Sequence, residues 1–102
     1  QSYFTITSSS ITAYTAVAGD QLLINTTQTT VTITLPASPA VGNEIVIIDA
    51  RGTFASNAVT VERNGQPINS GTNNLSLSTN GQAVTLVYID STRGWSFKTN
   101  TA

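Results

Sequence analysis

The sequence predicts an all-β protein, namely an antiparallel β-sandwich or small barrel of jelly-roll-like type with about eight to ten short strands. Two observations support this prediction. Apolar and hydroxyl residues alternate with a period of two through much of the chain, which is typical of half-buried strands. Turn signals recur at intervals of about 8–12 residues, the spacing expected of a sandwich or barrel. No segment has a helical period.

The clearest strand lies in residues 29–36, where Val31, Ile33 and Leu35 alternate with threonines. We expect these three side chains to face the core and Thr30, Thr32 and Thr34 to face solvent or a neighbouring subunit. Pro36 has no N–H to donate, so it ends the strand or moves it to an edge.

The residues before this strand contain weaker signals. Residues 2–7 and 11–17 have strand-like runs separated by three serines, Gly19-Asp20 marks a turn, and residues 21–25 form a short strand. We expect residues 1–18 to form an N-terminal arm with the first strands, and residues 19–102 to form a single β-domain.

The segment 44–49 follows a rigid loop with two prolines, and it is apolar at each of its four inner positions. Such a pattern indicates a central strand covered on both sides, or a strand with one face at a subunit contact.

Four further strands are expected at residues 58–63, 74–78, 82–90 and 95–98, with Asn-Gly turns at residues 64–65 and 80–81. After the first of these turns, residues 66–69 would return as the second strand of a hairpin. Trp95 could stack on a sugar, but its alternation with Ser96 favours core packing. The predicted core comprises Val31, Ile33, Leu35, Val59, Val61, Leu86 and Trp95.

The composition argues against enzyme catalysis and against a metal site. The chain has no His and no Cys, which removes the usual zinc ligands and the Ser-His and Cys-His nucleophile systems. Glu44 with Asp49, or Glu62 with Asp90, could form a glycosidase pair, but no spacing brings them together. Acidic residues at turns favour turn capping over a Ca²⁺ site. We therefore expect no enzyme activity, no metal and no cofactor.

Charge argues against two classes of partner. Charged residues make up 9% of the chain and the net charge is −1, against a typical charged fraction of about 25%. The four basic residues are scattered, so nucleic-acid binding by phosphate neutralisation is disfavoured. No apolar run approaches the ~20 residues of a membrane span, so no membrane partner is expected.

Residues 19–97 contain a series of turn and core motifs in a characteristic order. They are Gly19-Asp20, Thr32-Ile33-Thr34-Leu35-Pro36-Ala37-Ser38-Pro39, Gly42-Asn43-Glu44-Ile45, Asp49-Ala50-Arg51-Gly52, Asn57-Ala58-Val59-Thr60-Val61, Arg63-Asn64-Gly65 and Gly94-Trp95. This string resembles a β-module of virion structural proteins of tailed bacteriophages, cyanophages among them, which occurs in decoration proteins and tail fibres. The resemblance implies a non-enzymatic, trimeric component of the virion.

Two functions follow as hypotheses. The first is a homotrimeric capsid decoration (cement) protein that contacts the phage major capsid protein. The alternative is a tail-fibre or appendage module that binds tail proteins and a host-surface glycan. In either case we expect subunit contacts through Tyr3, Phe4, Ile45, Ile47, Arg51 and Arg63, of which the arginines would pair through their planar guanidinium groups.

Overall fold

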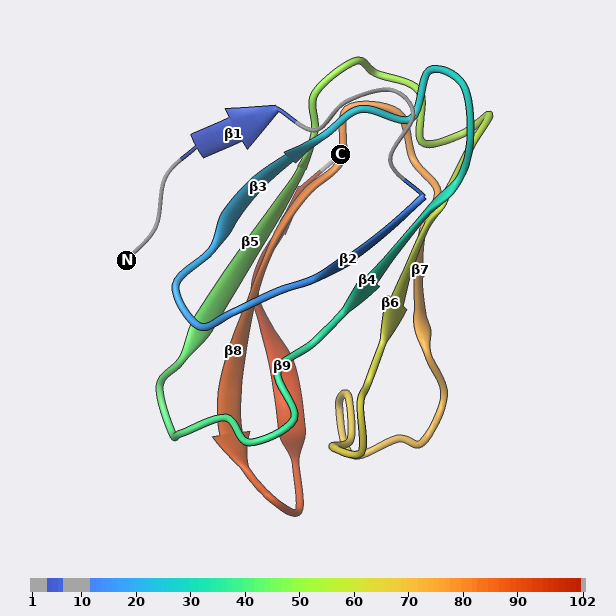
Figure 1. The fold of residues 1–102 in the computed structure, drawn as a ribbon. Helices are drawn as coiled ribbons and strands as arrows, with labels where there is room; N and C mark the ends of the chain where they lie inside the picture. Colours follow the sequence, from blue (N-terminus) through green and yellow to red (C-terminus); the bar gives the residue numbers. More distant parts are fainter. Residues whose placement is uncertain (1–3, 7–11, 102) are drawn as a thin grey trace.

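The computed structural model describes residues 4–6 and 12–101, and this part of the chain contains nine β-strands and no helix. Five strands form one sheet in the order β1-β3-β5-β8-β9, here called sheet A, and four form sheet B in the order β2-β4-β6-β7 (Figure 1). The strand bounds are β1 (Phe4–Ile6), β2 (Ala13–Thr15), β3 (Gln21–Ile24), β4 (Val31–Thr34), β5 (Glu44–Asp49), β6 (Val59–Glu62), β7 (Leu75–Leu77), β8 (Ala83–Asp90) and β9 (Gly94–Thr101). The predicted all-β class is confirmed.

The first six strands alternate between the two sheets. In sheet A, β1 pairs parallel with β3 and β3 with β5, and in sheet B, β2 pairs parallel with β4 and β4 with β6. Parallel neighbours need a crossover connection instead of a tight hairpin. Here each crossover contains a strand of the opposite sheet, so the chain winds through three successive coils, and each coil adds one strand to each sheet.

The last three strands pair antiparallel: β7 with β6, β8 with β5, and β9 with β8. Both sheets are therefore mixed, which differs from the antiparallel, jelly-roll-like pairing that the sequence predicts. The physical reason is that alternation shows which side chains face the core, but it carries no information on the direction of the neighbouring strand. Regular turn spacing suggests hairpins where the chain in fact crosses between the sheets.

One hydrophobic core lies between the sheets, with side chains from both. Each of the seven residues predicted for the core is at most 1% exposed: Val31, Ile33, Leu35, Val59, Val61, Leu86 and Trp95. Ile45 and Ile47 of β5 and Phe54 of the following loop are also fully buried. Since a fully buried aliphatic or Phe side chain contributes about 1.5–3 kcal/mol relative to exposure, this shared core is what joins the two sheets.

The strands of the N-terminal segment take edge positions in the two sheets. β1 lies at the edge of sheet A beside β3, and β2 lies at the edge of sheet B, where Tyr14 is opposite Ile33. Ala16, directly after β2, is buried in the core. The division at residue 18 stays a prediction, but strands from both sides of it share the same sheets.

The Asn64-Gly65 turn has the geometry that its sequence predicts, whereas the segment after it does not return as a hairpin strand. Asn64 has φ of 53° and Gly65 has φ of 91°, and two successive positive values are characteristic of a type I′ turn. Residues 66–69 then run to β9, where Ile68 forms an isolated bridge with Trp95. The antiparallel partner of β6 is instead β7, which begins at Leu75.

Candidate functional site

Asp49, the last residue of β5, holds together the loops at one end of sheet A. Its Oδ1 accepts hydrogen bonds from the backbone N–H groups of residues 51–53 at 2.8–3.2 Å. Its Oδ2 accepts from the N–H groups of Phe54 at 3.1 Å and Gly81 at 2.9 Å. One carboxylate thus joins the loop after β5 to the β7–β8 connection and positions Phe54 in the core.

The hydrogen bonds to Asp49 also determine its protonation state. Burial by itself would raise the pKa of this carboxyl group, because burial disfavours the charged form. The amide hydrogen bonds, led by those of Gly81 and Phe54, stabilise the carboxylate more strongly and hold the pKa of Asp49 below its usual value. Asp49 is therefore an ionised acceptor for backbone groups, and it does not have the raised pKa of a general acid.

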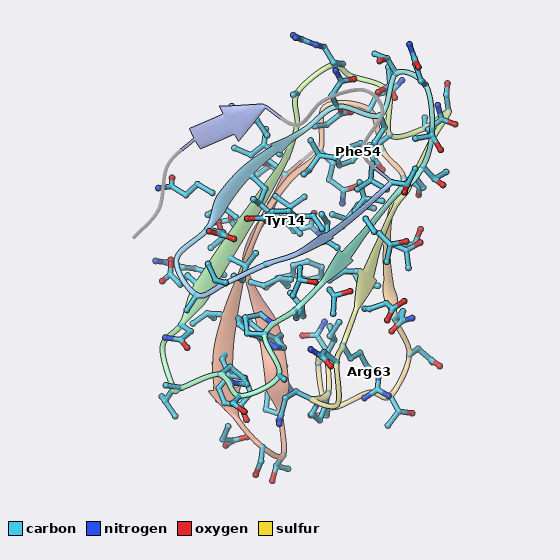
Figure 2. The ribbon with its side chains drawn as sticks, viewed as in Figure 1. Tyr14, Phe54 and Arg63 are labelled. Carbon is cyan, nitrogen blue, oxygen red and sulfur yellow. The ribbon has the colours of Figure 1, made fainter. Side chains whose placement is uncertain are left out.

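Asp20 has a similar structural role beside β2. Its Oδ2 accepts a hydrogen bond from the backbone N–H of Val17 at 2.9 Å and another from the Tyr14 hydroxyl at 3.1 Å (Figure 2). Burial, followed by the interaction with Asp20, raises the pKa of the Tyr14 phenol. The hydrogen bond between Tyr14 and Asp20 connects β2 of sheet B to the turn that leads into β3 of sheet A.

The other acidic groups also lack the arrangement of a catalytic or metal site. Asp90 Oδ1 accepts from the N–H groups of Thr92 at 3.0 Å and Arg93 at 2.7 Å, which caps the β8–β9 turn. Glu44 forms a surface ion pair with Lys98 at 2.9 Å. Within the described residues, no group of three or more acidic, His or Cys side chains could hold a metal ion.

The two carboxylates of β5 do not form a pair. Burial alternates along this strand, and Glu44 falls on its outward side while Asp49 falls on its inward side. In the other pair considered from the sequence, Glu62 belongs to sheet B and Asp90 to sheet A.

The outer face of sheet A carries a group of aliphatic side chains. Strand register places Leu23 opposite Ile48, Ile48 opposite Ala83, and Val46 and Val87 on the same side of the sheet. All are partly exposed and lie outside the core cluster. We call these five residues the apolar face: Leu23, Val46, Ile48, Ala83 and Val87. Their sequence signal is a pair of adjacent apolar residues within a strand, as at Leu22-Leu23, because neighbours in a strand point to opposite faces.

The outer face of sheet B has a different composition. Thr32 of β4 lies opposite Thr60 of β6, which lies opposite Ser76 of β7, and Thr34 is on the same side. We call these four residues the hydroxyl face. It contains the outward half of the threonine-rich strand, and it has polar groups that can keep their hydrogen bonds to water.

The structure corrects the predicted subunit contact at β5. Ile45 and Ile47 are both fully buried between the sheets, so the prediction that they form an intersubunit surface is wrong. Their side chains fill the core of a single chain, and the residues between them in sequence, Val46 and Ile48, point outward instead. A subunit contact through this strand would use the apolar face.

The other four residues predicted for subunit contacts have varied positions. Tyr3 lies outside the described residues, and Phe4 is placed by its backbone alone, in β1 opposite Gln21. Arg51 is exposed in the loop after β5. Arg63 is partly buried and donates from Nη1 to the backbone oxygen of Gln66 at 3.3 Å (Figure 2). Arg51 and Arg63 are the two whose side chains the structure describes, and they follow strands of different sheets, β5 of sheet A and β6 of sheet B.

The aromatic side chains separate into packed and accessible rings. Trp95 is fully buried and meets Tyr88 edge to face, with ring centroids 5.5 Å apart, so its indole is closed to a sugar. Tyr14 is 37% exposed and is the one large aromatic in the exposed class among the side chains that the structure describes. It is the ring that a stacked ligand could reach.

Comparison with known proteins adds no assignment, because no protein-family model and no curated protein matches the chain. In the described residues there is no helix long and apolar enough to cross a membrane.

Proposed function

We propose that this protein is a non-enzymatic structural protein of a bacteriophage virion and, within the particle, a homotrimeric capsid decoration (cement) protein. In this role it binds the major capsid protein and stabilises the shell. The observation that carries the proposal is the use of the acidic groups. Four of the five acidic side chains, Asp20, Glu44, Asp49 and Asp90, bind turn amides, a tyrosine or a lysine, and these contacts support a structural role for them.

The virion assignment is supported by the resemblance of residues 19–97 to the phage β-module. Several motifs of that resemblance contain residues that this fold uses in its turns and loops. Gly42 and Gly94 have φ of 88° and 71°, and Asp49 organises the loop that contains Gly52. These motifs support a shared fold, and the capsid location is the proposal that we add to it.

We further propose that the two packed sheets are a β-sandwich and not a barrel. Each sheet keeps two edge strands, β1 and β9 in sheet A and β2 and β7 in sheet B, whereas a closed barrel has no edges. Exposed edges favour pairing with other chains. A closed trimer would cover such edges with neighbouring copies.

Electron cryomicroscopy of the particle tests the location. We expect density for this chain in many copies at local three-fold positions of the capsid. Finding a few copies at the tail would overturn the decoration role.

Stripping the protein from the particle tests the stabilising role. Shells without it should break at lower temperature or on dilution into low salt, and adding the purified protein back should restore their resistance. Stripped and complete capsids of equal resistance would contradict a cementing function.

A tail-fibre or appendage module that binds a host-surface glycan is the second candidate, because Tyr14 presents an exposed ring. Sugars commonly stack on aromatic rings of this kind. Under this hypothesis a glycan array gives a signal that Tyr14→Ala removes and Tyr14→Phe largely keeps. Silence on the array, together with unchanged host adsorption after deletion of the protein, would eliminate it.

A further inference from the structure

We infer that the apolar face of sheet A is the surface through which copies of this chain contact one another. This inference rests on the proposed homotrimer and identifies the surface that forms it. The other faces of the two sheets are poorer candidates, since the hydroxyl face is polar and the inner faces of both sheets are already filled by the core.

Register gives the apolar face its continuity. Leu23, Ile48 and Ala83 form one row across β3, β5 and β8. In the next row, Val46 of β5 lies opposite Thr85 of β8. In the row after that, Glu44 of β5 lies opposite Val87 of β8. Directly opposed side chains in a sheet lie within contact distance of each other, so these residues form one patch across the three central strands of sheet A.

The contrast between the two outer faces shows that this patch is specific to sheet A. The corresponding rows of sheet B hold Thr32, Thr60 and Ser76. In both sheets the inner side chains of the strands already form the core. The core would therefore be the same whether the outward positions held aliphatic residues or threonine and serine. Aliphatic groups left in water lose the stabilisation that their burial would give, and contact with another molecule supplies that burial.

Charge favours a second copy of this chain as the occupant. The single carboxylate that borders the patch, Glu44, is neutralised by Lys98 at 2.9 Å, so the patch offers no net charge to a basic, acidic or nucleic-acid partner. In the proposed trimer, three such uncharged aliphatic surfaces would converge around the three-fold axis without charge repulsion. The net charge of −1 also leaves little repulsion between copies.

The dimensions of the molecule set an upper limit on the area of a contact across sheet A. The molecule measures 35 × 27 × 22 Å, and its shortest extent is that of two sheets packed about 10 Å apart with their outer side chains. Each broad side therefore projects roughly 900 Å² in total, an upper limit that is comparable to the ~800 Å² that each partner loses in a standard-size interface. The apolar face is the partly exposed central part of that side, so a contact of this size would also include polar neighbours such as Thr85 and Glu44.

Light scattering of paired variants tests the surface. We expect the wild type to have about three times the chain mass of 10.7 kDa. The double variant Val46→Lys/Val87→Lys should have a dissociation constant at least about 100-fold higher, since like charges would face each other across the contact. The matched control Thr32→Lys/Thr60→Lys places two lysines on the hydroxyl face and should stay associated, with circular dichroism showing that both variants fold.

Cysteine reactivity supplies a second measurement that does not depend on a charged variant folding. The chain has no Cys, so Val87→Cys and Thr60→Cys each carry a single thiol. In concentrated protein, Val87→Cys should react with a maleimide at least tenfold more slowly than in dilute protein, while Thr60→Cys should react at the same rate in both.

The outcomes separate the surface from the proposed function. An oligomer that persists in Val46→Lys/Val87→Lys, or a Val87→Cys thiol that reacts equally at all concentrations, overturns the surface and leaves the trimer intact. Dissociation of both lysine variants to the same extent also overturns it. A wild type that is monomeric at about 200 µM overturns the surface and the homotrimer together, and the capsid location is then decided by microscopy alone.

Discussion

Replacement of Gly94 by alanine gives the most direct test of the packing between β9 and the 66–70 segment. Gly94 has φ of 71°, and a Cβ atom at this position would lie 1.9 Å from the backbone oxygen of Pro67. The same oxygen accepts the hydrogen bond from Trp95 N–H at 2.8 Å. A methyl group therefore cannot enter without moving the backbone that holds Trp95 in the core.

The size of the effect can be separated into two terms with a matched control. Gly52 has φ of 70°, and a Cβ there would meet nothing within 4 Å. Alanine at Gly52 therefore carries only the cost of the left-handed conformation, about 1–2 kcal/mol. At Gly94 the same cost is joined by overpacking of about 1–3 kcal/mol and the loss of a hydrogen bond worth about 1 kcal/mol. We expect Gly94→Ala to destabilise the protein by about 3–6 kcal/mol.

Urea denaturation and thermal unfolding, followed by Trp95 fluorescence, would measure both variants. A loss of 1 kcal/mol lowers the melting temperature of a domain of this size by about 4–8 °C. Gly52→Ala should thus melt about 4–16 °C below the wild type, and Gly94→Ala should be largely unfolded or melt far lower. Equal shifts in the two variants would refute the argument, because they would show that the close approach of Pro67 has no energetic effect.

Three further predictions concern polar contacts. Asp49→Asn should cost about 2–3 kcal/mol at neutral pH, since one amide oxygen cannot replace a carboxylate that accepts five N–H groups. Because the pKa of Asp49 is lowered on folding, its contribution is complete above the unfolded pKa of about 3.9 and is lost as the pH falls through the folded pKa. Urea titrations of both proteins from pH 7 to pH 2 should therefore converge, and parallel curves would contradict this role. Tyr14→Phe removes the hydrogen bond to Asp20 and should cost about 1 kcal/mol in the same assay; no loss would mean that a water molecule replaces the Tyr14 hydroxyl as the donor to Asp20. Lys98→Ala breaks an exposed ion pair and should change the unfolding free energy by less than about 1 kcal/mol, so a larger change would imply a buried contact.

The inward-facing half of the fold can be predicted from the sequence because its alternation is unambiguous. Val31, Ile33 and Leu35 alternate with threonine, and only one of the two possible registers buries them. Their complete burial follows from that pattern. The same strand shows what the pattern omits, since both neighbours of β4 in sheet B, β2 and β6, are parallel to it.

Strand β5 shows why a strand that is apolar on both sides resists prediction. A slip of one residue exchanges the two faces of a strand, and here either face can be buried. The charged ends give opposite indications: an outward Glu44 requires Ile45 and Ile47 to face inward, whereas an outward Asp49 requires the reverse. The structure takes the first choice and buries Asp49, which is possible because amides of the following loop and of Gly81 surround its carboxylate.

For the same reason, the sequence predicts only part of the candidate interaction surface. The sequence indicates that residues 44–49 could use one face for a subunit contact, but the identity of that face depends on the register of β5. Leu23, Ala83 and Val87 join it only through pairing with strands far away in the sequence. The arrangement of sheet A, more than any local motif, brings these residues together.

The nature of the apolar face leads to a final prediction about the forces that hold the copies together. The proposed contact would bury aliphatic groups beside one neutralised ion pair, so its free energy would come from apolar burial and not from charge attraction. Salt screens exposed charges, with a Debye length that falls from about 30 Å at 0.01 M to about 3 Å at 1 M. Apolar association lacks that dependence and instead carries a negative heat-capacity change. Sedimentation at 0.01 and 1 M NaCl should therefore give dissociation constants within about tenfold of each other. Dilution calorimetry between 10 and 40 °C should show an association enthalpy that becomes more negative on warming. A steep loss of association in high salt would mean that Arg51, Arg63 or another charged group forms the contact in place of the apolar face.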